Sequence, residues 1–314
     1  MKPAALFADA RCREHLAGLN HPECPERFDA VVDGLRRARL LERLMPLSPR
    51  TATFEELLLC HTRSYLEIAR HDIEAGYPSL TTGDTDVTPN SWELALLAAG
   101  GVLNAVDAVA AGEVRSAFCA VRPPGHHATP ARGMGFCVVN NISIGARYAQ
   151  RKHGLERVLI VDWDVHHGNG TQDIFYTDPA VFYFSTHQWP LYPGTGRAGE
   201  TGAGPGKGYT MNFPFPAGSG RKEILGSIEN SLVPAARQFR PDLVMISAGF
   251  DSRIGDLLGA FTLTDSDFAD LTRAVMAIAA EYAGGRVVSV LEGGYNLSGL
   301  ASAAAAHVGA LAAA

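Results

Sequence analysis

Four apolar segments of the sequence are each followed by residues that could bind a metal or transfer a proton. These residues lie in the motifs RPPGHH (122–127), DWDVHHGNG (162–170), GFD (249–251) and EGGY (292–295). Nearly continuous runs of Val, Ile, Leu and Phe are typical of strands buried on both faces of a parallel sheet. Because ligands bind beyond the carboxyl ends of such strands, we expect these His, Asp and Tyr residues to meet at one edge of the sheet.

Asp164, His166 and Asp251 are the candidate metal ligands. Asp164 and His166 lie two positions apart, so an extended segment places both side chains on the same face. Asp251 arrives from another strand end. Two carboxylates and one imidazole leave a fourth position open, as in catalytic zinc sites. Taken singly, the first two residues also suit a structural ion pair, and Asp251 also suits a cap or turn.

His126 and His127 follow a Pro-Pro-Gly segment, which predicts a turn that presents both rings. Beside a metal, one ring could activate water while the other handles the proton of a leaving group. Asp162 and Asn169 flank the ligand pair and are available partners for the second ring nitrogens. Tyr295 follows two glycines and could donate a hydrogen bond to a developing oxyanion. Alone, each of these residues also suits an ordinary surface or packing role.

Composition restricts the class of protein. Of the 314 residues, 46% are hydrophobic and 19% are charged, which is typical of a folded globular chain. The net charge of −6 and the lack of Lys/Arg runs argue against direct binding to nucleic acid. An acid at Asp9 interrupts any signal peptide, the apolar runs look too short to span a membrane, and five cysteines without a CxxC motif suggest a reducing compartment. We therefore expect a cytoplasmic protein.

Strand and helix patterns alternate along the chain, which predicts one doubly wound α/β domain over residues 1–314. The sheet should be mainly parallel, with helices on both faces. The clearest strands are expected at 116–121, 157–164, 180–187, 242–248 and 286–291. Helices are expected at 91–111, 140–152, 221–239, 265–283 and 298–311.

Residues 188–209 are rich in Gly and Pro and predict a long functional loop. The loop includes a GxGxxG match at 194–199. More glycines follow it instead of a helix, which argues against a dinucleotide site.

Several segments together resemble one known family. RPPGHH, GFCVVNN, DWDVHHGNGTQ, LYPGTG, SAGFD, LEGGYN and the N-terminal HPECPER are similar to the zinc-dependent histone deacetylase superfamily, which includes acetylpolyamine amidohydrolases. The resemblance covers almost the whole chain, and Asn169 and Glu292 are similar to its class II branch. It implies the arginase–deacetylase fold and a single catalytic domain of bacterial deacetylase type.

The resemblance also implies a role for each residue named above. Zn²⁺, with Fe²⁺ as an alternative, would be bound by the two aspartates and the histidine of the candidate ligand set. His126, paired with Asp162, would be the electrostatic histidine. His127, next to Asn169, would be the general base and acid, and Tyr295 would polarise the acyl carbonyl.

The substrate channel implied by the resemblance has three kinds of lining residue. Phe136 and Tyr192 would form its walls with the backbone of Gly135, and Tyr192 stands where the family more often has Phe. Leu258 is the matched gatekeeper. Asp84 is the candidate for the rim aspartate that grips the substrate backbone.

The family further implies two structural monovalent cation sites, the first of them for K⁺. The first would use Asp162, Asp164, Ser185 and the carbonyl of His166, and the second would lie around Phe175, Asp178 and Val181.

These features predict a metal-dependent amidohydrolase that removes acetyl or other short acyl groups from lysine side chains of proteins or peptides. An acetylpolyamine amidohydrolase is the alternative, although polyamine-selective relatives tend to have an acidic gatekeeper or an insertion near the rim. A two-manganese ureohydrolase would need a third carboxylate where this chain has Gly168, and an aspartate pair where it has Asp251-Ser252-Arg253. A non-catalytic acyl binder would not need Tyr295 or both histidines. Homo-oligomerisation is a further possibility that the sequence leaves open.

Overall fold

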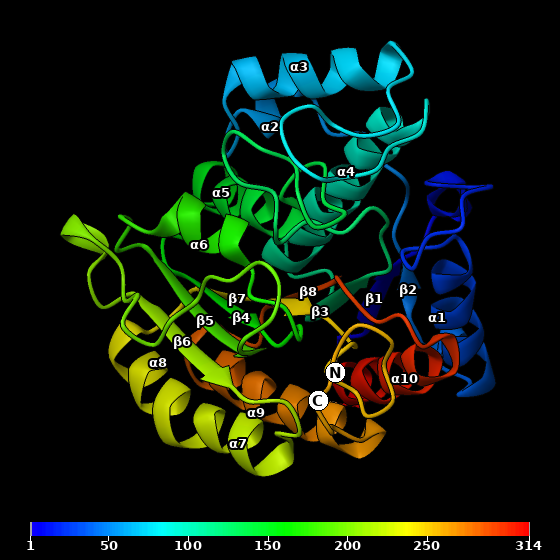
Figure 1. Ribbon diagram of the computed structural model, residues 1–314. Helices are drawn as coiled ribbons and strands as arrows, with labels where there is room; N and C mark the ends of the chain where they lie inside the picture. The colour runs from blue at the N-terminus through cyan, green and yellow to red at the C-terminus, as the bar shows by residue number, and fades with distance from the viewer. Residues whose placement is uncertain (1, 314) are drawn as a thin grey trace.

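The computed structural model describes residues 2–313 and is built around one eight-stranded sheet (Figure 1). Every pair of neighbouring strands is parallel, in the order β2-β1-β3-β8-β7-β4-β5-β6. The strands are β1 Ala4–Phe7, β2 Met45–Pro46, β3 Ser116–Cys119, β4 Val158–Asp162, β5 Val181–Gln188, β6 Thr210–Phe215, β7 Leu243–Ala248 and β8 Val287–Leu291. The predicted α/β class and parallel sheet are confirmed.

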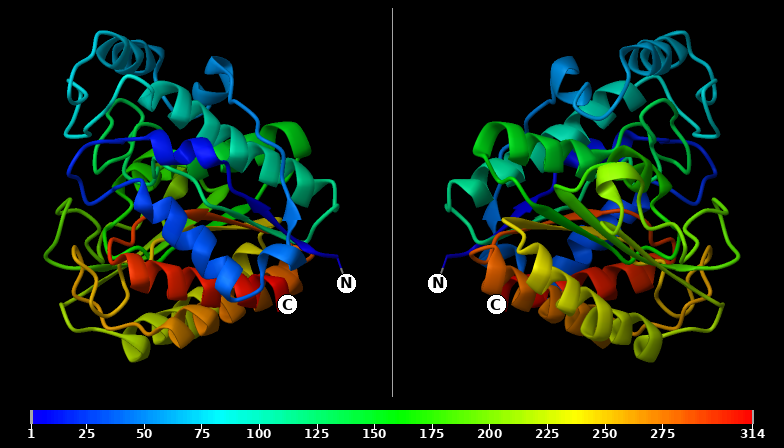
Figure 2. Two further views of the ribbon diagram at one scale, coloured as in Figure 1. Left: turned by 90° about the vertical axis from the view of Figure 1, so that its right-hand side faces the viewer. Right: turned by 90° about the vertical axis from the view of Figure 1, so that its left-hand side faces the viewer.

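Helices cover both faces of this sheet (Figure 2). One face carries α4 and α5, which pack on each other, and the other carries the packed series α1, α10 and α9. The main helices are α1 Glu26–Arg37, α3 Arg63–Glu74, α4 Ser91–Ala110, α5 Asn141–His153, α6 Asn169–Phe175, α7 Arg221–Ser227, α8 Val233–Phe239, α9 Asp265–Tyr282 and α10 Leu297–Ala313. A single turn, α2, spans Phe54–Leu57. Because both faces are covered, the central strands are buried throughout, which explains their continuous apolar sequences.

The predicted helix at 221–239 is interrupted. A π-helical segment, Ile228–Leu232, joins α7 to α8. Pro234 stands at the start of α8. Since proline has no backbone N–H, it cannot make the regular bond to the preceding turn, and the wider π-helical turn accommodates this gap.

The sequence did not indicate β1, β2 or β6. β1 and β2 are only four and two residues long, too short for a periodic signal. β6 contains Pro214, which is tolerated because β6 is the edge strand of the sheet.

Helix α4 corrects the expectation that no apolar run is long enough for a membrane. By length and composition it could cross one, but most of it is buried inside the fold. Small residues allow this close packing: a Cβ on Gly101 would lie 2.3 Å from the ring of Phe7 in β1. The apolar composition of α4 therefore reflects its position in the core.

The four strands expected to deliver chemical groups are neighbours in the sheet, in the order β3-β8-β7-β4. Their carboxyl ends meet at one edge, and the loops that follow them lie together on the side of the sheet that faces the viewer in Figure 1. The predicted segment 188–209 is irregular from residue 189 apart from a short 3₁₀ turn, Gly204–Gly206, and follows the carboxyl end of β5.

Candidate active site

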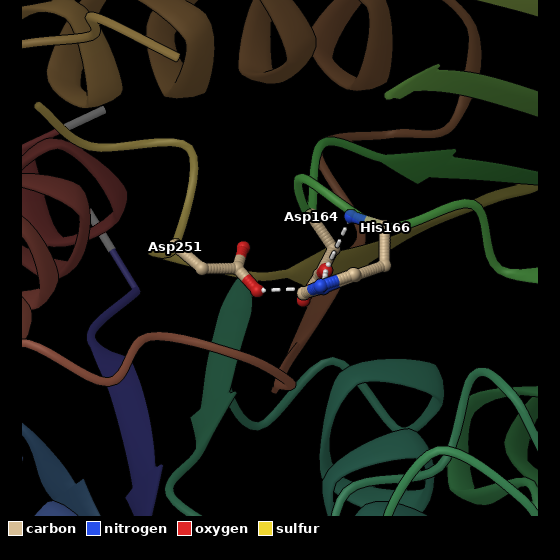
Figure 3. Close-up of side chains that lie close together, drawn as sticks. All are labelled: Asp164, His166 and Asp251. Atoms are coloured by element: carbon tan, nitrogen blue, oxygen red, sulfur yellow. Dashed lines mark hydrogen bonds and ion pairs between the residues drawn. The ribbon is translucent and has the colours of Figure 1, made fainter. Parts of the chain in front are cut away.

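Asp164, His166 and Asp251 converge at the carboxyl edge of the sheet, as Figure 3 shows. The loop after β4 carries the first two, and Asp251 follows β7. His166 Nδ1 lies 3.1 Å from Asp164 Oδ1 and 3.1 Å from Asp251 Oδ2. One ligand atom from each residue fits within a group of atoms no more than 4.8 Å apart, and all three residues are buried.

Backbone amides fix the two carboxylates of this cluster. The N–H of Val165 donates to Asp251 Oδ1 at 2.8 Å, and the N–H of Gly293 donates to Asp164 Oδ2 at 2.8 Å. These amides occupy the carboxylate oxygens that face away from His166. The opposite oxygens, Asp164 Oδ1 and Asp251 Oδ2, are thereby held facing the imidazole.

Two glycines make room for the carboxylates. A Cβ on Gly249 would lie 2.1 Å from Asp164 Oδ2, and a Cβ on Gly293 would lie 2.1 Å from Asp251 Oδ2. Both distances are far below van der Waals contact. The glycines of the GFD and EGGY motifs are therefore required by the close approach of strand ends to the cluster.

The electrostatics of the cluster fit a divalent cation. Burial and the charge of Asp164 raise the pKa of Asp251 to about 7. Burial opposes the charged form of His166, but its bonds to both carboxylates outweigh burial and raise its pKa to about 10. Two buried carboxylates this close need a positive charge between them, and an oxygen and nitrogen donor set suits Zn²⁺ or Fe²⁺. The residues present therefore fit the metal that the sequence predicts.

His126 lies beside the cluster and pairs with the carboxylate of Asp162. Its Nδ1 is 3.0 Å from Asp162 Oδ2, which also accepts a hydrogen bond from the hydroxyl of Tyr183 at 3.1 Å. Burial alone would lower the pKa of His126, but the carboxylates of Asp162, Asp164 and Glu292 raise it to about 10. The buried Asp162–His126 pair thus favours the protonated form of the imidazole next to the candidate ligands.

His127 pairs with an amide, whereas His126 pairs with a carboxylate. Its Nδ1 lies 2.8 Å from the amide oxygen of Asn169, which can only accept, so Nδ1 carries the proton. Burial, followed by the charges of His126 and His166, lowers the pKa of His127 well below its usual value. The ring is therefore neutral, and its Nε2 is free to accept a proton.

Tyr295 is held by groups that sequence reasoning missed. Asp256 accepts hydrogen bonds from the backbone N–H of Tyr295 at 2.7 Å and of Asn296 at 3.0 Å. Buried Arg27 donates to the carbonyl of Gly294 at 2.7 Å, and its guanidinium lies 5.0 Å from the centre of the Tyr295 ring. Arg27 belongs to the HPECPER motif, but it lies far from Tyr295 in the sequence, so the sequence alone did not indicate this contact.

A cavity of about 310 Å³ leads from the surface to these groups. All five predicted substrate-binding residues line it, together with the predicted ligand His166 and the predicted catalytic residues His127 and Tyr295. Leu191 is an additional wall residue that was not predicted. The lining residues are Asp84, His127, Gly135, Phe136, His166, Leu191, Tyr192, Leu258 and Tyr295.

The residues of the first predicted cation site are neighbours. Ser185 of β5 pairs in register with Asp162 of β4, and the Ser185 hydroxyl lies 2.9 Å from Nδ1 of His187.

In the second predicted site, the carbonyl of Phe175 accepts the backbone N–H of Asp178 at 3.0 Å. The Asp178 side chain forms an ion pair with Arg147, and Val181 begins β5. The carboxylate of Asp178 is therefore already paired with a cation.

Comparison with known proteins gives a consistent result. Residues 21–311 match the histone deacetylase domain family. The crystal structure of the HDA15 HD domain superposes with a TM-score of 0.92 at 37% identity, covering 99% of this chain and 89% of that one.

Curated proteins that are similar to this chain are also named as deacetylases. "Histone deacetylase 10, chloroplastic" of Oryza sativa subsp. japonica is 40% identical over 96% of this chain and 73% of its own length. "Probable deacetylase" of Archaeoglobus fulgidus is 41% identical over 91% of this chain and 79% of its own. "Polyamine deacetylase HDAC10" of Homo sapiens is 44% identical over 89% of this chain, which spans 44% of that protein. The chain is a member of the histone deacetylase family, whose enzymes are hydrolases acting on amide bonds.

Proposed function

We propose that this chain hydrolyses the side-chain amide of acetyl-lysine in peptides or proteins. A divalent metal, Zn²⁺ or Fe²⁺, would be held by Asp164, His166 and Asp251. One observation carries the proposal: the cavity with aromatic walls ends at the Asp–His–Asp cluster, beside a neutral His127 and Tyr295. Such a channel admits a narrow chain and exposes only its end to the reactive groups.

The channel walls suit the methylene stem of lysine. The Phe136 ring lies 6.0 Å from the Tyr295 ring, and the Tyr192 ring lies 5.2 Å from the His127 ring, both in edge-on arrangements. Each methylene buried between such rings contributes about 0.8 kcal/mol. The acetylated nitrogen carries no charge, so the stem can enter without the cost of desolvating a cation.

The side chains around the metal site have separate roles in proton transfer and charge stabilisation. A metal bound at the cluster would supply Lewis acidity to the acyl carbonyl and to the attacking water. His127 Nε2 takes the proton of the water while Asn169 holds Nδ1. The Tyr295 hydroxyl donates to the oxyanion that develops on the carbonyl. The imidazolium of His126 offsets negative charge, and protonated His127 returns its proton to the leaving amine.

These side-chain contributions are needed because two carboxylate ligands formally cancel a divalent charge. A second metal, as in a ureohydrolase, would need another carboxylate near the first site. At Gly168, even a Cβ would lie 2.2 Å from Asp162 Oδ2. The geometry therefore favours a single metal.

An acetylpolyamine is the second candidate substrate. The human relative is named a polyamine deacetylase, and Asp84 places one exposed carboxylate at the mouth of the channel. Leu258, the gatekeeper, supplies no charge there. A polyamine carries extra cations whose hydration a selective site must replace, so we favour acetyl-lysine. A structural K⁺ beside Asp162, a cytoplasmic location and homo-oligomerisation stay predictions.

The test compares two substrates on the metal-loaded protein. We expect a higher kcat/KM for an acetyl-lysine peptide than for acetylspermidine. A preference of tenfold or more for acetylspermidine, about 1.4 kcal/mol in transition-state binding, would overturn the substrate assignment and leave the metal chemistry intact.

The gatekeeper allows a sharper test. Leu258→Glu should shift the kcat/KM ratio toward acetylspermidine because the new carboxylate can pair with a distal ammonium. Leu258→Gln is the matched control, since it has the same length without the charge. If both variants shift the ratio equally, size and not charge controls the rim, and this reading of Leu258 is wrong.

A further inference from the structure

Asp84 at the channel mouth is fixed by donors from two other loops. The backbone N–H of Gly135 donates to Asp84 Oδ1 at 2.9 Å. The hydroxyl of Tyr192 donates to Asp84 Oδ2 at 3.0 Å. The segment before α4 carries Asp84, the loop before α5 carries Gly135, and the long loop after β5 carries Tyr192. One carboxylate therefore ties together three loops of the rim.

We propose that the Tyr192 hydroxyl is a positioning group that holds Asp84 ready to accept an N–H from the substrate just beyond the methylene stem. This inference rests on the proposed function and makes it more specific. It predicts selection for acyl amines with an N–H donor at the outer end of the stem, as in the backbone of an acetyl-lysine peptide.

The hydrogen-bonding capacity of Asp84 supports this role. Each carboxylate oxygen has two acceptor positions, so one on each oxygen stays available after the bonds to Gly135 and Tyr192. Asp84 is exposed, and an exposed carboxylate held by one bond would turn freely about its side chain. Because one donor binds each carboxylate oxygen, the side chain is held in one orientation, and so are its available acceptor positions.

The position of Tyr192 is itself well defined. Its ring packs edge-on against His127, with centroids 5.2 Å apart, while 38% of the residue stays exposed at the mouth. Burial and the adjacent Asp84 raise the pKa of Tyr192, so its hydroxyl stays protonated and can only donate to that carboxylate. A Phe could form the same wall but would leave Asp84 Oδ2 without this partner.

The experiment uses Tyr192→Phe on the full-length, metal-loaded protein with two substrates. One is an acetyl-lysine peptide, and the other is N-butylacetamide, which has the stem and the amide but no N–H beyond the stem. The ratio of the peptide KM to the N-butylacetamide KM should rise about two- to tenfold in the variant, the range expected for one hydrogen bond. The loss should fall on KM of the peptide and not on its kcat. An unchanged ratio would overturn the proposal.

Tyr282→Phe is the control variant. It lies at the end of α9, at the edge of the sheet opposite the site, and should leave both KM values as in the wild type. The Asp84→Ala background tests the route of the effect. If Tyr192 acts through Asp84, adding Tyr192→Phe to Asp84→Ala should change the ratio no further. A full additional loss would instead assign Tyr192 a direct contact and overturn the positioning role.

A binding measurement separates this inference from the proposed function. The Kd of the peptide for the metal-free protein, measured by calorimetry, should rise by the same factor in Tyr192→Phe. If the metal-loaded wild type hydrolyses neither substrate, the proposed function fails while this comparison still decides the role of Tyr192. A Kd that falls in the variant would mean that the Tyr192–Asp84 contact blocks the mouth, which contradicts the proposal.

Discussion

His126 and His127 are adjacent in sequence and their ring centroids lie 4.0 Å apart, yet their surroundings shift their pKa values in opposite directions. The carboxylate of Asp162 stabilises an imidazolium at His126. His127 pairs with the neutral amide of Asn169, and burial together with the charges of His126 and His166 lowers its pKa. The two rings therefore have distinct roles, set by their partners and by the charges around them, and the proton acceptor is His127.

His127→Ala should lower kcat by about 10²–10⁴-fold, the usual contribution of general acid–base catalysis. Metal content, measured by atomic absorption, should stay at the wild-type level, because His127 is not in the ligand set. Steady-state kinetics on an acetyl-lysine peptide provides the comparison. An unchanged kcat would move the proton-transfer role to His126.

Tyr295→Phe should retain fold and metal and lose about 10²–10³-fold in kcat, the usual cost of one oxyanion donor. The backbone contacts of Tyr295 with Asp256 do not depend on the hydroxyl, so circular dichroism should be unchanged. If KM rises while kcat is preserved, the hydroxyl binds ground state and transition state equally, and its assigned role is wrong.

At the scale of elements, helix α10 is attached to the core through a buried polar group. The Nδ1 of His307 lies 2.6 Å from the hydroxyl of Thr272 in α9, and its Nε2 lies 2.8 Å from the hydroxyl of Ser289 in β8. The rings of Phe118 and Trp163 pack edge-on against it. Since Thr272 donates to a backbone carbonyl, Nδ1 of His307 is the donor of the first bond.

This arrangement predicts acid sensitivity. Burial lowers the pKa of His307 to about 3, whereas the unfolded chain has an imidazole pKa of about 6.5. The unfolded state therefore binds the proton first, so stability is complete above about pH 6.5 and falls as the pH drops toward 3. Melting temperatures between pH 7.5 and 4.5 should fall less steeply for His307→Gln than for the wild type. Equal slopes would show that His307 does not contribute.

The metal ligands could be predicted from the sequence because they directly follow recognisable strands. The ligands Asp164 and His166 share one motif, and Asp251 follows a strong apolar run, so the rule that ligands bind at the carboxyl edge of the sheet was enough to group them. Arg27 and Asp256 contact the Tyr295 segment from distant parts of the chain. Such contacts have no periodic signal and need the tertiary structure.

At the scale of the whole molecule, the alternation of strands and helices predicted the parallel sheet, while the exceptions have local causes. The π-helical segment lies just before Pro234, and Pro214 interrupts the strand pattern of β6, which tolerates it as the edge strand of the sheet. Helix α4 is as apolar as a membrane span because one layer of the fold packs around it. Composition alone cannot distinguish a core helix from a membrane helix.

The central claim is that this fold brings three ligands together to bind a catalytic metal. The most direct measurement is hydrolysis of an acetyl-lysine peptide before chelation, after chelation and after stepwise return of Zn²⁺. We expect activity to disappear with the metal and to return in proportion to bound Zn²⁺ up to one ion per chain, and we expect Asp164→Ala to bind none. Full activity in protein shown to contain no metal would contradict the account.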